Sequence, residues 1–251
     1  MVIGVVGCGN MGSALARGMG VPVVCSDVDA ALAQRLATET GGEAVATNAE
    51  VAERADVVLL CHKPYQLQEV ADQIAGKAKA VASILGGVPL QSLEDAYPST
   101  PVIRLMPNTP VEIRRGVICA ARGSLVDDAL ASEVEELLGR CGKVFTIEDR
   151  LMDVAMGLIS VAPAYVALFA EGWIDAGVAH GMPAHLAGPL VAETIAGSGD
   201  LLAAKDVDTL AVRRAVTTPG GVTAQGLAAL ESAGMRAALR DALDAVLRHL
   251  E

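Results

Sequence analysis

The chain has 251 residues, of which 52% are hydrophobic and only 2% aromatic, and its formal net charge is −11. This length allows one large domain or two modest domains with a real core. The acidic balance, without a basic block, argues against nucleic acid and anionic membranes as partners, and so few aromatic residues leave no platform for stacking bases.

Cysteine and histidine positions give no sign of a disulfide framework or a metal site. The five cysteines are scattered and form no Cys-x-x-Cys pair, and the four histidines are not grouped with acidic residues at ligand spacing. The N-terminal apolar run is too short for a signal peptide and has no basic residue before it. We therefore expect a cytoplasmic protein with reduced thiols and no bound structural metal.

The chain opens with the pattern of a dinucleotide-binding turn. The apolar run Val2–Val6 predicts a buried strand, and it leads into Gly7-Cys8-Gly9-Asn10-Met11-Gly12 and then a helical pattern over 11–19. Gly7 suits a tight turn, Gly9 lets the backbone approach a pyrophosphate, and Gly12 lets helix and strand touch. A helix N-terminus at this point favours bound phosphate. A chance glycine turn is the alternative, but the flanking strand and helix favour dinucleotide binding.

Asp27 stands about 20 residues after the glycine turn, where such sites place the carboxylate that binds the adenine ribose. A carboxylate accepts hydrogen bonds from a free 2′-hydroxyl and repels a 2′-phosphate, and the nearest following basic residue is Arg35. Asp27 therefore favours NADH over NADPH. The alternative is a helix N-cap, because Ser26, Asp27 and Asp29 can all cap the next helix.

Apolar runs and helical patterns alternate through the first 150 residues, which is typical of a doubly wound, mostly parallel sheet. We expect strands at 2–6, 21–25, 44–46, 57–61, 80–84 and 102–106, and helices at 11–19, 29–40, 64–75 and 89–96. Two further strands, at 116–120 and 143–147, flank a helix at 127–138 and complete the sheet, with room for one antiparallel strand.

From Asp149 onward helical periods dominate, broken by glycine and proline, so we place domains at 1–149 and 150–251. The stretch Val154–Ala170 carries no charge and could be mistaken for a membrane span. It is slightly short, contains Pro163, and is bounded by acidic residues, which favours a helix buried in a bundle or a dimer.

Three polar motifs follow predicted elements. Lys63-Pro64 comes after a strand, so Lys63 can stand at the ligand-binding edge of the sheet or be an ordinary solvated lysine. The run Met106–Pro110 either holds polar groups at the same edge or is a simple turn. Thr218-Pro219-Gly220-Gly221-Val222-Thr223 precedes a helix, and it can form an anion nest for a small carboxylate or a capped loop.

Taken together, these motifs resemble the pyrroline-5-carboxylate reductase family over nearly the whole chain. The resemblance is carried by the opening glycine turn, Asn48, His62-Lys63-Pro64, Gly86-Gly87-Val88, Met106–Pro110, Pro163-Ala164-Tyr165 and Thr218–Thr223. It implies an α/β fold in which an N-terminal Rossmann domain is followed by an all-helical C-terminal dimerisation domain, in a homodimer or larger homo-oligomer. It also implies hydride transfer from NADH or NADPH to the C=N carbon of a cyclic imine, 1-pyrroline-5-carboxylate, to give L-proline.

Matched position by position, the resemblance implies two sets of site residues. The cofactor set comprises Gly7, Gly9, Asn10, Met11, Gly12, Asp27, Asn48, Cys61, His62, Lys63, Pro64, Ile84, Leu85 and Gly86. The substrate set comprises Thr218, Gly220, Gly221, Val222 and Thr223, with Thr223 as the candidate catalytic residue. A protonated imine already accepts hydride, so alignment and exclusion of water are the main requirements, and no catalytic triad is expected.

The chain departs from the family pattern near the imine pocket. Met156 stands for a usual threonine, Ile159-Ser160-Val161-Ala162 for Ser-Gly-Ser-Gly, and Arg214 for an acidic residue. Two candidate substrates therefore remain: the proline precursor and another cyclic imine of specialised metabolism. A non-catalytic dinucleotide sensor would not need the threonine–glycine motif. A hydroxyacid dehydrogenase would usually carry a lysine between Asp153 and Glu171, where none is found.

Overall fold

The computed structural model describes residues 1–250; Glu251, the last residue of the predicted helical domain, lies outside them. The chain divides into two compact units, Met1–Val161 and Ala162–His249. Each unit is described by itself below.

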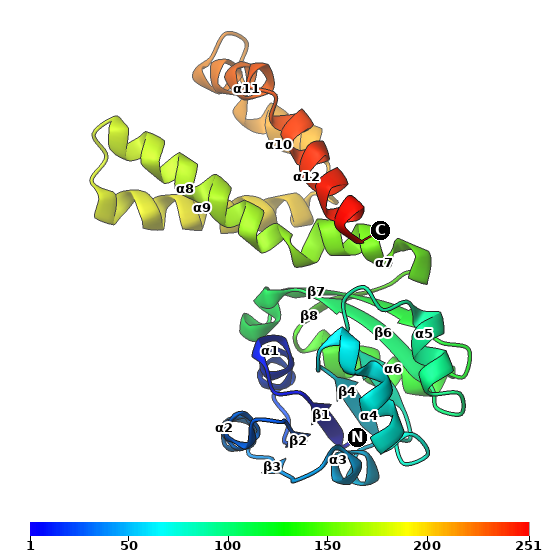
Figure 1. Ribbon diagram of the computed structural model, residues 1–251. Coiled ribbons are helices and arrows are strands. Elements are labelled where there is room, and N and C mark those ends of the chain that lie inside the picture. The colour runs from blue at the N-terminus through cyan, green and yellow to red at the C-terminus, as the bar shows by residue number, and fades with distance from the viewer. Residues whose placement is uncertain (251) are drawn as a thin grey trace. The chain divides into compact units, whose positions relative to one another are not determined.

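Within the described residues, the first unit is built on an eight-stranded sheet with the order β3-β2-β1-β4-β5-β6-β7-β8 (Figure 1). The strands are β1 (Ile3–Val6), β2 (Val23–Ser26), β3 (Glu43–Ala44), β4 (Val57–Leu60), β5 (Val81–Ser83), β6 (Val102–Pro107), β7 (Gly116–Arg122) and β8 (Gly142–Thr146). All neighbours pair in parallel except β6 and β7. The predicted Rossmann sheet is confirmed.

The single antiparallel pairing reverses two strands rather than one. A short 3-10 helix, η2 (Thr109–Ile113), joins β6 to β7, and this connection is too short for the crossover that parallel strands need. The chain therefore turns back beside β6. Helix α6 (Asp128–Gly139) then supplies a crossover, so β8 pairs in parallel with β7.

The other helices of the sheet region are α1 (Asn10–Met19), α2 (Ala30–Thr40), α3 (Asn48–Arg54), α4 (Leu67–Ile74) and α5 (Leu90–Ala96). Helix α3 was missing from the predicted segments because Val51 is its one large apolar residue, which leaves no helical period to detect. Its start is nevertheless marked by a Thr-x-x-Glu pattern, since the Thr47 hydroxyl accepts a hydrogen bond from the Glu50 N–H at 3.2 Å. The predicted helix 64–75 is divided into the 3-10 helix η1 (Pro64–Gln66) and α4.

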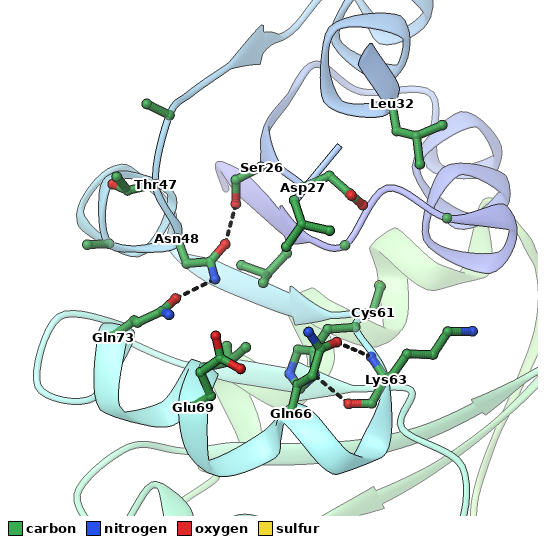
Figure 2. Close-up of a pocket in the computed structure, with 18 of the residues that line it drawn as sticks. Ser26, Asp27, Leu32, Thr47, Asn48, Cys61, Lys63, Gln66, Glu69 and Gln73 are labelled. Atoms are coloured by element: carbon green, nitrogen blue, oxygen red, sulfur yellow. Dashed lines mark hydrogen bonds between the residues drawn. The ribbon is translucent and has the colours of Figure 1, made fainter. Parts of the chain in front are cut away.

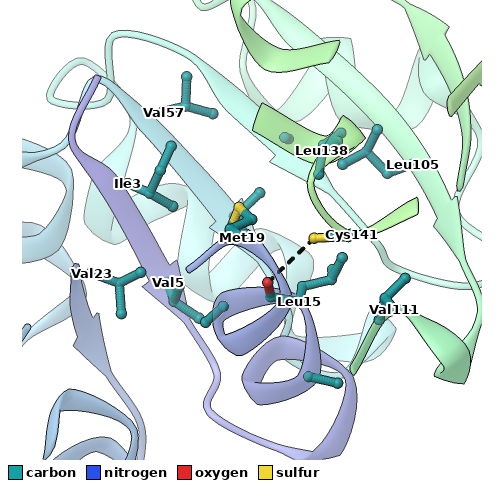
Figure 3. Packing of buried hydrophobic residues seen from close by; sticks show 14 of the residues in the cluster. Ile3, Val5, Leu15, Met19, Val23, Val57, Leu105, Val111, Leu138 and Cys141 are labelled. Carbon is teal, nitrogen blue, oxygen red and sulfur yellow. Dashed lines mark hydrogen bonds between the residues drawn. The ribbon is translucent and has the colours of Figure 1, made fainter. Parts of the chain in front are cut away.

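Apolar side chains fill both faces of this sheet. One cluster joins strands β1, β2, β4, β5 and β6 to helices α1, α2 and α6, and Figure 3 shows its centre around Leu15 and Met19. A second cluster lies under α3, α4 and α5. Leu15 is fully buried, and each such side chain contributes about 1.5–3 kcal/mol of folding free energy.

The first unit extends beyond the sheet to Val161. Its last segment comprises η3 (Asp149–Leu151), α7 (Met152–Ala155) and a π-helical turn, η4 (Met156–Ser160). Arg104 of β6 is 3% exposed, and its guanidinium donates to Asp149 at 2.7 Å and to Asp153 at 3.2 Å. These two ion pairs attach the segment to the sheet, and they explain why the compact unit ends later than the predicted domain boundary at 149–150.

Within the described residues, the second unit contains helices alone, in agreement with the predicted all-helical domain. They are α8 (Ala162–Ala179), α9 (Ala184–Ala204), α10 (Thr209–Val216), α11 (Val222–Ser232) and α12 (Met235–Leu250). The continuous helical run Asp149–Ala179 is long and apolar enough to cross a membrane, by length and composition only. We predicted that Val154–Ala170 is buried in a bundle or a dimer. Within the single chain Ala155 and Gly157 are buried, whereas the part of the stretch that lies in α8 is not.

Candidate functional site

The glycine turn after β1 has the geometry that its sequence predicts. Gly7 has φ +97°, and a Cβ there would stand 2.7 Å from the backbone of Cys61 and His62. A Cβ on Gly12 would meet the Gly7 carbonyl oxygen at 2.5 Å, so glycine lets α1 approach the strand. A Cβ on Gly9 would have nothing within 4 Å, and Gly9 caps α1 without a side-chain hydrogen bond. The turn therefore leaves open space in front of a helix N-terminus, the arrangement that favours phosphate.

A cavity of about 920 Å³ opens beside this turn, at the carboxyl ends of β1, β2 and β4 (Figure 2). Nine of the fourteen predicted cofactor residues line it: Gly7, Gly9, Asn10, Met11, Asp27, Asn48, Cys61, His62 and Lys63. The other five do not line it: Gly12, Pro64, Ile84, Leu85 and Gly86. Gly12 packs against the turn, Leu85 is buried in the core, and Gly86 follows β5 along the same edge of the sheet.

Asp27 faces the cavity and does not cap a helix. Its Oδ2 accepts a hydrogen bond from the Cys8 N–H at 2.6 Å, and its Oδ1 accepts one from the Asp29 N–H at 2.9 Å. The cap of α2 is Asp29, whose Oδ1 accepts from the Ala31 N–H at 2.9 Å. The capping alternative therefore applies to Asp29, and the Asp27 carboxylate is held rigidly at the end of β2.

A polar wall of the cavity is built around Asn48, which the sequence analysis predicted, and includes Gln66, Glu69 and Gln73, which it missed. The Ser26 hydroxyl donates to Asn48 Oδ1 at 2.6 Å, and the Asn48 amide donates to Gln73 Oε1 at 2.6 Å. Figure 2 shows Gln66, Glu69 and Gln73 projecting from η1 and α4 along this wall. Their spacing of three and four residues places them on one helix face, a signal that could have identified them from the sequence.

The segment after β4 presents neutral groups and one cation. His62 Nδ1 lies 2.9 Å from the Lys63 carbonyl oxygen, and burial lowers the pKa of this imidazole, so Nδ1 donates as part of a neutral ring. Burial raises the pKa of the Cys61 thiol to about 12, which keeps it protonated and unreactive. Lys63 is exposed at the rim of the cavity and is the one Lys or Arg among the lining residues.

The proline-bracketed motif after β6 serves the fold. Asn108 is 8% exposed, and its side-chain Oδ1 accepts a hydrogen bond from the Val117 N–H at 2.8 Å. Its backbone carbonyl accepts from the Val111 N–H at 3.2 Å, which starts the 3-10 turn into β7. These hydrogen bonds support the turn interpretation of this motif, because the Asn108 side chain stabilises the turn between β6 and β7.

In the second unit, the threonine–glycine motif forms the connection between α10 and α11. Gly220 has φ +71°, the Gly221 N–H donates to the Thr218 carbonyl at 3.0 Å, and a Cβ on Gly221 would collide with the Thr218 hydroxyl oxygen. Helix α11 begins at Val222 with Gly221 as its N-cap and no side-chain cap. The predicted threonine cap is therefore not formed. The first backbone N–H groups of α11 have no side-chain cap, and Thr218 and Thr223 lie next to them in the chain.

Comparison with known proteins gives a consistent result. Residues 149–251 match the family model for pyrroline-5-carboxylate reductase dimerisation, and residues 2–87 match that for NADP oxidoreductase, coenzyme F420-dependent. The chain is 35% identical over 203 residues to the pyrroline-5-carboxylate reductase of Synechocystis, covering 80% of this chain and 76% of that protein.

Solved structures agree over the full length. The pyrroline-5-carboxylate reductase of Coxiella burnetii superposes with a TM-score of 0.91 at 25% identity, covering 99% of this chain and 96% of that one. The pyrroline carboxylate reductase of Plasmodium falciparum, solved with NADP bound, gives a TM-score of 0.87 at 28% identity, covering 100% and 97%. This protein therefore belongs to the pyrroline-5-carboxylate reductase family.

Proposed function

We propose that this chain is an NAD(P)H-dependent reductase that converts 1-pyrroline-5-carboxylate into L-proline, with a cofactor domain at 1–149 and a substrate and dimerisation domain at 150–251. The observation that carries the proposal is the open glycine turn, which faces a cavity of about 920 Å³ with the fixed Asp27 carboxylate on its wall. The relatives named above, and the NADP bound to one of them, support the same reaction.

The residues at the cavity fit a dinucleotide. Gly7–Gly12 and the N-terminus of α1 would hold the pyrophosphate, because backbone N–H groups and the helix dipole favour anions there. Asp27 and Asn48 would hold the adenine ribose. Cys61–Pro64 and Ile84–Gly86 follow the next two strands of the sheet, β4 and β5, and would lie along the nicotinamide half.

We further propose that NADH is the preferred cofactor. The Asp27 carboxylate is fixed by two N–H donors, so it cannot turn away from a 2′-phosphate, and Glu69 adds a second carboxylate to the same cavity. Lys63 is the one basic side chain of the lining and belongs to the segment after β4, not to the ribose end at β2. These carboxylates would repel a 2′-phosphate bound in the cavity and so disfavour NADPH.

The bound cofactor supplies the hydride, which goes to the C=N carbon while the imine nitrogen keeps its proton and becomes an amine. The chain then needs to position the imine and exclude water. Thr218, Gly220, Gly221 and Val222 would hold the carboxylate at the uncapped N-terminus of α11. Thr223, in the first turn of that helix, is the proposed catalytic residue, with its hydroxyl directed to the imine nitrogen.

Another cyclic imine is the second candidate substrate. The π-turn Met156–Ser160 carries Met156 and Ile159 packed on an apolar cluster with Met106 and Cys119. An apolar wall of this kind suits a less polar ring than the proline precursor. Both substrates share the cofactor, the hydride step and the anchoring loop.

The second unit points to self-association, and we propose a homodimer or larger homo-oligomer in the cytoplasm. Helix α8 exposes large apolar side chains, with Leu168 69%, Phe169 43% and Trp173 45% exposed. The family model that matches this region is named for dimerisation. All five cysteines are free thiols, as the reducing cytoplasm would maintain them.

The test is a spectrophotometric assay in which purified protein is given 1-pyrroline-5-carboxylate with NADH or NADPH. We expect consumption of both cofactors, with a higher kcat/KM for NADH, and L-proline as product. A parallel panel of other cyclic imines separates the two candidate substrates. No turnover of any imine above background would exclude the reductase, and a strong NADPH preference would exclude the role assigned to Asp27.

A further inference from the structure

A π-helical turn, Met156–Ser160, lies beside the loop after β5, beyond the residues that line the cavity. The Met156 Cε atom of this turn lies 3.6 Å from the position that a Cβ on Gly86 would occupy. At the other end of the turn, the Ser160 hydroxyl donates to the Pro107 carbonyl oxygen at 3.1 Å. The turn therefore spans from the loop after β5 to the end of β6.

This segment is anchored, so the place of Met156 is well defined. Arg104 holds Asp149 and Asp153 just before the turn, and Met152 is fully buried in the same apolar cluster. Because the Ser160 hydroxyl is already used by Pro107, the wall that the turn offers beside Gly86 is the thioether of Met156. π-Turns inside helices occur frequently at functional sites.

The order of the strands sets which part of a dinucleotide would reach this wall. The loops at the carboxyl ends follow the sheet order β2, β1, β4, β5, with Asp27 after β2, the glycine turn after β1, Lys63 after β4 and Gly86 after β5. Neighbouring strands are about 4.8 Å apart, so these four loops cover about 14 Å. With the adenine ribose at Asp27 and the pyrophosphate at the glycine turn, the nicotinamide lies toward Gly86.

We propose that Met156 is a contact residue for the nicotinamide ring, and this rests on the proposed function. Its flexible, polarisable thioether packs against the flat ring by dispersion and keeps water from the carbon that donates the hydride. Met156 therefore determines affinity for the nicotinamide half of the cofactor and has no part in binding the adenosine half.

Calorimetric titration with NADH and with ADP-ribose, which lacks the nicotinamide ring, tests this assignment. We expect Met156→Ala to weaken NADH binding about fivefold while ADP-ribose binding stays unchanged. Leu158→Ala is the matched control, because Leu158 belongs to the same π-turn but is 61% exposed. That variant should bind both ligands like the native protein.

A second variant guards against a loss of folding. Met156→Gln keeps the length of the side chain and replaces the thioether by an amide, so circular dichroism should remain native while NADH binding falls and ADP-ribose binding does not. Equal weakening of both ligands, or no weakening of NADH, in either folded variant would overturn the role of Met156 and leave the reductase intact. Native protein that binds neither ligand would instead refute the proposed function itself.

Discussion

The two units of this molecule are both rich in apolar residues, yet they bury them in different ways. The first unit fills both faces of its sheet with clusters that include fully buried residues such as Leu15, Leu36 and Leu60. In the second unit, the buried apolar residues among those described are Ala187 and Val191. Apolar content in a sequence therefore shows how much surface needs covering, and the partner that covers it can be another copy of the chain.

The difference extends to the two candidate sites. The cofactor cavity is lined throughout by residues of the first unit, from Val6 to Gln73. The threonine–glycine loop of the second unit is largely exposed, with Val222 88% exposed. Cofactor binding should therefore depend on the first unit's own fold, whereas we expect the exposed threonine–glycine loop, our proposed carboxylate site, to gain its surroundings through assembly.

The largest expected effect is on folding of the first unit. Leu15→Ala should lower the free energy of unfolding by about 2–5 kcal/mol, because it leaves a cavity in a fully buried cluster. Leu168→Ala in α8, which is 69% exposed, should cost less than about 0.5 kcal/mol in dilute protein. Urea unfolding at low protein concentration measures both free energies. Equal losses in the two variants would contradict the conclusion that the first unit buries its apolar residues within the chain and α8 does not.

A smaller effect, about 10- to 100-fold in the dimer dissociation constant, is expected from a charge on the apolar face of α8. Phe169→Glu places a carboxylate where apolar side chains need to be covered, which disfavours association by about 1.4–2.7 kcal/mol. Sedimentation analysis across a dilution series measures it. Ile113→Glu is the control, because Ile113 is an exposed apolar residue of the first unit, 73% exposed. If both variants dissociated equally, α8 would not be the association surface.

The smallest expected effect concerns cofactor choice within the first unit. Asp27→Asn keeps the shape of the side chain, removes its charge and replaces one of its two accepting oxygens by an NH2 group. The lost acceptor affects both cofactors, whereas the lost charge should raise the ratio of NADPH to NADH kcat/KM about tenfold, equivalent to about 1.4 kcal/mol. Asp29→Ala removes the cap of α2 and should cost about 1 kcal/mol of stability without changing that ratio. If the ratio changed in Asp29→Ala and not in Asp27→Asn, Asp29 would govern cofactor choice and our proposal for Asp27 would be wrong.

Much of the first unit could be predicted because its signals are local. The glycines at 7 and 12 are demanded by positive φ and close backbone approach, and alternating apolar runs predict buried parallel strands. Helix α3 was missed because Val51 is its one large apolar residue and a single residue shows no period, although its Thr47 cap could be recognised in the sequence. The reversal of β7 depended on the short η2 connection, which composition alone does not reveal.

The site was predicted where residues adjoin a motif, and the one-face spacing of Gln66, Glu69 and Gln73 marks a helix face without saying what that face meets. Glu69 and Gln73 reach the cavity because α4 packs beside β4, and the hydrogen bond from Asn48 to Gln73 joins residues that are far apart in the chain. The placement of Met156 beside Gly86 likewise brings the π-turn near the loop after β5. No spacing rule connects such pairs.

The sequence by itself determined the Rossmann unit, the glycine turn and the helical second half, because backbone sterics and hydrophobic periodicity act over a few neighbouring residues. Tertiary structure alone decided that Asp29 and not Asp27 caps α2, that Asp149–Ser160 belongs with the sheet, and that α8 keeps its apolar face exposed in the single chain. These outcomes depend on which distant surfaces meet, and a one-dimensional pattern carries the need for burial but not the identity of the partner.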